Sequence, residues 1–113
     1  MLTRLQITNY ALIRDLQVDF EPGFNIITGE TGAGKSILLG ALGLILGNRA
    51  DLQLMKDQTK KCIIEGHFGI DGYRLEPFFN ENNIDFDPLT ILRREIIPSG
   101  KSRAFINDTP VTL

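Results

Sequence analysis

The feature that most limits what this chain can fold into is a glycine-rich stretch, GETGAGKS, at residues 29–36. Glycine tolerates backbone conformations and close approaches that a Cβ atom forbids. The preceding residues 24–28 read FNIIT, a composition typical of a strand, and residues 35–46 form an apolar run typical of a buried helix. The order of strand, glycine loop and helix predicts a sharp turn from a sheet into a helix.

The spacing of the fixed residues matches G-x-x-x-x-G-K-[ST], the Walker A or P-loop pattern. The N–H groups of such a loop surround a phosphate, and the helix start adds partial positive charge. In this pattern Lys35 pairs with the β- and γ-phosphates, and the Ser36 hydroxyl binds Mg²⁺. A chance match in a chain this long occurs on the order of 0.5% of the time. We therefore expect a nucleotide and Mg²⁺ at Gly29, Glu30, Thr31, Gly32, Ala33, Gly34, Lys35 and Ser36.

Composition sets limits on everything else. The 113 residues suffice for one hydrophobic core, and 12 Lys plus Arg against 14 Asp plus Glu give a net charge of -2. Any nucleic-acid contact must therefore be local or shared with a partner. The single cysteine, Cys62, is expected in the core of a protein from a reducing, cytoplasmic setting. The apolar residues 36–48 are too few to cross a bilayer, so no membrane partner is expected.

Hydrophobic periodicity predicts one mixed α/β unit rich in antiparallel strand. A hairpin is expected first, with its connection at residues 9–12, then a turn at 21–23 and the strand at 24–28. The helix at 35–46 is apolar on almost every face, as expected for one packed between a sheet and other elements, and should end at Gly47. The remaining expected elements are a loop at 49–59, a strand at 61–68, a short helix near 75–79 with Pro77 in its first turn, an acidic loop at 80–88, and a hairpin of 89–97 with 102–107.

Four segments together resemble the RecN family of bacterial DNA-repair proteins, relatives of the structural-maintenance-of-chromosomes (SMC) and Rad50-like ATPases. They read ITNYALI, TGETGAGKS, LGNRAD and SRAFINDTPVTL. The likeness extends from residue 1 to 113, with residues 51–90 matched only weakly. One departure is visible, because the family usually has Asn-Gly in the last turn and this chain has Asn107-Asp108.

The resemblance implies the N-terminal lobe of an ABC-type ATPase head, with antiparallel hairpins beside a P-loop strand and its helix. ATP binding would then join two heads, and hydrolysis would separate them during DNA double-strand-break repair and recombination. Residues 1–113 lack the family's glutamine-bearing loop, coiled coil, signature motif and Walker B strand. We expect a single lobe that binds ATP with Mg²⁺ but holds no catalytic residue for hydrolysis. Its implied partners are the C-terminal lobe of the same parent chain, a second head and DNA, in the cytoplasm and associated with the nucleoid.

Two other functions are compatible with the motif. A small P-loop phosphotransferase would pass the γ-phosphate to an acceptor, but such kinases usually open with the P-loop strand, and here two strands precede it. A structural module with an empty P-loop is the other alternative. Titration with ATP and Mg²⁺ distinguishes that module from a nucleotide-binding lobe.

Several cations outside the motif allow two interpretations. In related heads a basic residue of the first hairpin approaches the nucleotide, and Arg14 either does so or is an exposed strand cation. The last predicted hairpin could contact DNA phosphates. The favoured interpretation is a solvated face and edge where charges discourage strand pairing. Its cations are Arg93, Arg94, Lys101 and Arg103.

Overall fold

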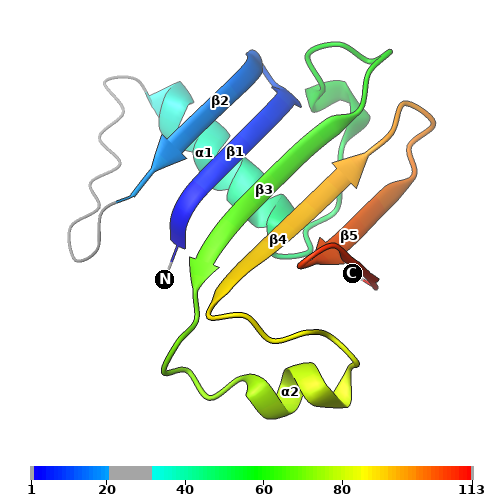
Figure 1. The fold of residues 1–113 in the computed structure, drawn as a ribbon. Helices are drawn as coiled ribbons and strands as arrows, with labels where there is room; N and C mark the ends of the chain where they lie inside the picture. Colours follow the sequence, from blue (N-terminus) through cyan, green and yellow to red (C-terminus); the bar gives the residue numbers. More distant parts are fainter. Residues whose placement is uncertain (1, 21–31, 113) are drawn as a thin grey trace.

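A computed structural model describes residues 2–20 and 32–112. Six strands form one antiparallel sheet in the order β2-β1-β3-β4-β5-β6, and helix α1 lies across one face of it (Figure 1). The expected turn at 21–23 and P-loop strand at 24–28 lie outside the described residues. The elements are β1 Leu2–Tyr10, β2 Ile13–Asp19, α1 Gly32–Ile45, the 3-10 helix η1 Leu52–Leu54, β3 Cys62–Gly69, α2 Glu76–Glu81, β4 Leu89–Ile96, β5 Ser102–Ile106 and β6 Thr109–Val111.

The first hairpin is confirmed, with a tighter connection than expected. Tyr10 pairs with Ile13, so only two residues, Ala11 and Leu12, make the turn. Asn9 has a left-handed φ of 57°, which interrupts the alternation of the strand and leaves both Asn9 and Tyr10 buried. The predicted connection began too early because asparagine is common in turns, whereas Asn9 lies within the distorted end of β1.

Helix α1 begins three residues before the expected start and ends as expected. Its last turn is closed by hydrogen bonds from Gly47 N–H to Leu44 O, 3.2 Å, and from Asn48 N–H to Gly43 O, 3.0 Å. Gly47 has a φ of 102°, which suits the residue after a helix end in this arrangement. No helix among the described residues is long and apolar enough to cross a membrane.

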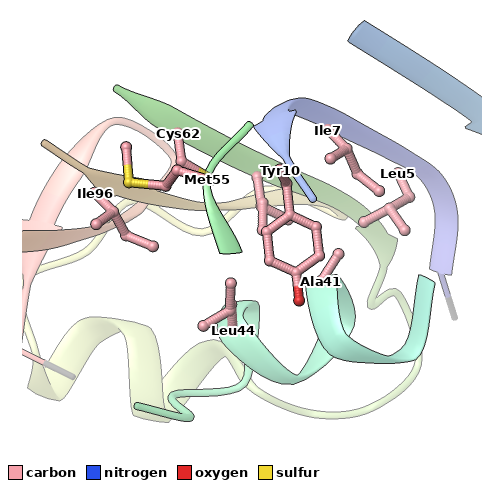
Figure 2. Packing of buried hydrophobic residues seen from close by; sticks show 9 residues of the cluster. Leu5, Ile7, Tyr10, Ala41, Leu44, Met55, Cys62 and Ile96 are labelled. Carbon is pink, nitrogen blue, oxygen red and sulfur yellow. The ribbon is translucent and has the colours of Figure 1, made fainter. Parts of the chain in front are cut away.

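The core lies between α1 and the sheet (Figure 2). Leu5, Ile7 and Ile64 are fully buried on the sheet face, and Ala41 and Leu44 pack against them from α1. Cys62 belongs to the same cluster and is 0% exposed, which confirms its expected place. The remaining members of the buried cluster are Tyr10, Met55 and Ile96.

The expected packing of α1 against a sheet is confirmed, and part of its apolar surface is exposed within the described part of the chain. Leu39 is 52% exposed and Leu46 is 67% exposed. Both lie on the side of the helix that the sheet does not cover. The apolar composition of α1 therefore exceeds what its contacts with this sheet require.

The second half of the chain follows the predicted order of elements, and the structure adds the 3-10 helix η1 and the strand β6. Pro77 lies in the first turn of α2, and β4 and β5 form the expected hairpin. The loop predicted at 49–59 contains η1. Periodicity did not predict the strand β6, but the resemblance placed the family's last turn at Asn107-Asp108. That turn has positive φ at both Asn107, 48°, and Asp108, 65°. That is the geometry of a two-residue type I′ turn, which Asn and Asp tolerate, so Asp108 here takes the place of the family's usual glycine.

A substitution at Gly40 tests how closely α1 approaches β1. A Cβ built at Gly40 would lie 2.5 Å from the Tyr10 hydroxyl oxygen, and the next Tyr10 atom lies at 3.6 Å. We expect Gly40→Ala to lower the free energy of unfolding by about 1–3 kcal/mol, despite the better helix propensity of alanine. In a Tyr10→Phe background the clash disappears, and the same change should be neutral or stabilising by up to about 1 kcal/mol. Urea denaturation of the four proteins measures the coupling; an equal cost in both backgrounds would refute the contact.

Candidate nucleotide-binding site

The P-loop motif spans the start of α1. Gly29, Glu30 and Thr31 lie outside the described residues. The helix begins at Gly32, and its first turn includes the backbone of Lys35; Ala33 and Gly34 lie between them, and Ser36 follows with an exposed side chain. The first N–H groups of a helix have no carbonyl partner within the helix, and they carry its partial positive charge. The motif therefore coincides with a helix end of the kind that binds anions.

The opposite end of α1 is held by Arg94 from β4. Arg94 is 3% exposed, and its Nη1 donates to Leu44 O at 2.7 Å and to Asn48 O at 2.9 Å. Its Nε donates to the Ser102 hydroxyl on β5. Burial lowers the pKa of Arg94, with a smaller opposing effect from Cys62, but a guanidinium stays protonated in proteins. A buried cation thus hydrogen-bonds the carbonyl end of the helix that carries the motif.

The four cations of the last hairpin do not form one patch, and their interpretation as a solvated face is wrong for Arg94. Arg93 points to the other side of the sheet, where its guanidinium lies 4.3 Å from the Phe105 ring centroid and 2.7 Å from Asp108 Oδ1. Its Nε lies 3.1 Å from a carboxylate oxygen of Glu95. The remaining two, Lys101 and Arg103, are exposed as expected.

Arg14 is exposed on β2 and belongs to a second group of basic residues, away from the last hairpin. Together with Lys56, Lys60 and Lys61 it lines a groove of about 760 Å³, which Asp15 and Asp57 also line. The exposed side chain of Arg14 is compatible with both of its interpretations. Its strand position beside the loop of residues 56–61 was not foreseen.

Asn9 organises that loop and was missed by the sequence analysis. Its side-chain oxygen accepts the Asp57 N–H at 2.6 Å, and its Nδ2 donates to Asp57 O at 2.8 Å and to Lys60 O at 3.0 Å. The loop also closes on itself, since the Asp57 carboxylate accepts from the Thr59 hydroxyl and N–H. These bonds lower the pKa of Asp57. One buried amide thereby holds a loop that carries three lysines.

Comparison with known proteins identifies the family of this chain. Residues 4–111 match the family described as an AAA domain. The chain belongs to this family.

Within the AAA domain family, the chain is 41% identical over 114 residues to the DNA repair protein RecN of Vibrio cholerae, and 39% identical over 115 residues to that of Bacillus subtilis. Both alignments cover 100% of the chain but only 21% and 20% of those proteins. The chain thus spans about a fifth of the length of these relatives. The resemblance to RecN proteins inferred from the motifs is confirmed.

A solved structure of an Smc head, bound to the C-terminal winged-helix domain of ScpA, has a similar fold. The TM-score is 0.79 at 20% identity, with coverage of 98% of this chain and 36% of the other. At that identity the likeness concerns the fold alone. It confirms the expected fold class, an α/β lobe with antiparallel hairpins beside a helix.

We expect Asn9→Ala to lower the free energy of unfolding by about 2–4 kcal/mol. It removes hydrogen bonds worth roughly 1 kcal/mol each and puts alanine at a left-handed φ. Asn9→Gly, which accepts that φ, should be less damaging and isolates the hydrogen bonds. Urea denaturation measures the cost, and hydrogen exchange at the Asp57 amide measures the loosening of the loop. A loss below about 0.5 kcal/mol in Asn9→Ala would contradict this role.

Burial raises the pKa of Cys62 from its ordinary 9.0 to about 11, and the nearby Arg94 opposes this effect. The thiol therefore stays neutral in the folded protein at pH values where the unfolded chain ionises. Its stabilising contribution is complete below about pH 9 and is lost as the pH rises to about 11, on the order of 2 kcal/mol in total.

Unfolding measured from pH 8 to 11 in the parent protein and in Cys62→Ala checks this contribution. Burial, and to a smaller extent Cys62, also raises the pKa of Tyr10, so the difference between the two proteins reports the thiol together with its effect on Tyr10. Parallel curves would contradict the assignment.

Proposed function

We propose that this chain is the nucleotide-binding lobe of an ATPase head and that residues 29–36 bind ATP with Mg²⁺. The observation that carries the proposal is the start of α1 at Gly32, inside the GETGAGKS motif. A helix that starts there directs its unpaired N–H groups toward the loop. The similarity to RecN proteins and to an Smc head supports the same assignment.

The proposed roles follow from the chemistry of each group. Backbone amides of residues 29–36 surround the β-phosphate, and Lys35 pairs with the β- and γ-phosphates. Ser36 is exposed in the early part of α1 and offers an oxygen donor of the kind Mg²⁺ prefers. One protein oxygen is compatible with Mg²⁺, because this ion usually keeps several waters and phosphate oxygens. Bound there, the metal would neutralise charge on the triphosphate.

We propose further that residues 1–113 form one lobe of a DNA double-strand-break repair and recombination ATPase. The C-terminal lobe of the parent chain would complete the head, a second head would join it when ATP binds, and DNA would be the substrate of the whole. The exposed Leu39 and Leu46 on the outer side of α1 support a covering lobe. A cytoplasmic, nucleoid-associated location fits the RecN relatives. No residue of this lobe is assigned to catalysis, so hydrolysis would require the completed head.

A phosphotransferase has less support. Two strands precede the motif in the described chain, and the named relatives are DNA-repair proteins. An empty, purely structural P-loop makes a different prediction for ATP titration and is tested below.

We expect Lys35→Ala to weaken ATP binding by about 10- to 150-fold, because a charged hydrogen-bonding group contributes roughly 1.5–3 kcal/mol. Its unfolding temperature should stay within a few degrees of the parent's. Isothermal titration with ATP and Mg²⁺ measures the affinity. Lys101→Ala, at an exposed lysine in the β4–β5 turn, is the matched control and should bind as the parent does.

Equal affinity in the parent and in Lys35→Ala would refute the assignment of the site. Absence of binding in both would favour the structural module. Transfer of the γ-phosphate to an added acceptor by the parent would favour the phosphotransferase.

A further inference from the structure

We propose that Arg94 is a positioning residue for nucleotide binding: it holds the carbonyl end of α1 to the β4–β5 hairpin and thereby sets where the opposite, phosphate-binding end of the helix lies. This inference rests on the proposed function of residues 29–36. Arg94 lies at the far end of α1 from that motif, so it would act through the helix and not by contact with the nucleotide.

The carbonyl end of α1 needs a cation that the helix does not supply. Its last turn consists of Leu42, Gly43, Leu44 and Ile45, none of them basic. Gly43 O and Leu44 O accept N–H groups from residues 48 and 47. Arg94 then adds a second donor to Leu44 O and provides one for Asn48 O. The charged donor complements the partial negative charge of this helix end.

Arg94 on β4 joins the end of α1, which is distant in the sequence, to the neighbouring strand β5. Leu44 O and Asn48 O lie 50 and 46 residues before it, and Ser102, which accepts from Nε, lies on the next strand. The side chain is almost wholly buried, and a planar guanidinium donates in fixed directions. The helix end is therefore fixed relative to both β4 and β5, with little freedom for the linking group.

Apolar packing alone constrains α1 weakly along its axis. Among the side chains of residues 36–45, which are the described ones of this helix, only Ala41 and Leu44 are buried in the core cluster, with partly buried neighbours at Ile37, Leu38 and Ile45. Gly40 and Gly43 contribute no side chains that could interlock with the sheet. Hydrophobic contact is non-directional, so directional hydrogen bonds at one end are well suited to set the axial position.

A displacement at the Arg94 end reaches the phosphate end because α1 is a stiff, continuous element. Its 14 residues span about 20 Å at ~1.5 Å per residue. An axial shift of the last turn moves the first turn by the same amount. Binding sites lose performance when their groups move by more than about 0.5 Å. The direct charge effect of Arg94, by contrast, decays within the last turn.

The test compares three variants of the full 113-residue chain, with ATP and Mg²⁺ as the probe. Arg94→Met removes every hydrogen bond of the guanidinium, and Arg94→Lys keeps the charge but loses its planar set of donors. Arg103→Met, at an exposed position of the same hairpin, is the matched control. Affinity is measured by titration at a temperature where each protein is fully folded, and hydrogen exchange is followed along α1.

We expect about 10-fold weaker ATP binding in Arg94→Met, a smaller loss in Arg94→Lys, and no change in Arg103→Met. Exchange should accelerate in Arg94→Met along α1, including the hydrogen-bonded amides of its second turn, which are the first in the helix with carbonyl partners. A residue with a merely stabilising role would lower the unfolding temperature but leave the affinity of the folded protein unchanged. An affinity within twofold of the parent in Arg94→Met would therefore overturn the proposal.

Ser102→Ala provides a milder variant should Arg94→Met fail to fold. It removes the partner on β5 and leaves both helix carbonyl bonds possible, and we expect a 2- to 5-fold loss of affinity. No change there, together with failure of Arg94→Met to fold, would count against positioning. If the parent itself binds no ATP, the proposed function fails separately. The exchange of the hydrogen-bonded amides in the second turn of α1 then decides, and an unaltered rate in Ser102→Ala and Arg94→Lys overturns the role of Arg94.

Discussion

The structure depends on the contact between one apolar helix and one face of an antiparallel sheet. Leu5, Ile7 and Ile64 present a continuous apolar surface, and Ala41 and Leu44 of α1 cover it. Burial of such side chains contributes roughly 1.5–3 kcal/mol each for the larger ones. Because this helix also carries the P-loop motif at its start, the same contact that forms the core sets the place of the proposed phosphate site.

Two buried polar side chains supply what hydrophobic contact cannot. Asn9 holds the loop of residues 56–61, and Arg94 holds the carbonyl end of α1. Each satisfies backbone groups of a segment about 50 residues away, so each links parts of the chain that meet only after folding. Directional bonds of this kind determine orientation, whereas burial of apolar area determines mainly that the parts associate.

Period-two alternation predicted most strands within one or two residues, because each strand has one face in the core and one outside. The same alternation contained a signal for Arg94 that was not used. Arg94 has the parity of Leu92 and Ile96, so its strand position faces α1, whereas Arg93 faces the opposite side. Grouping the two arginines by charge concealed this difference. Only the resemblance indicated the turn before β6, because Asn107-Asp108 lacks the glycine that usually marks a type I′ turn.

The sequence by itself determined the P-loop motif, the resemblance to RecN proteins, and the succession of strands and helices. These properties depend on residue types at short spacings, which the linear order displays directly. Only the tertiary structure decided that Asn9 and Arg94 are buried, that one face of α1 is left uncovered by the described chain, and that the hairpin cations divide between two faces. Those properties depend on which distant backbone groups need partners, and that need arises only when the sheet and the helix have come together.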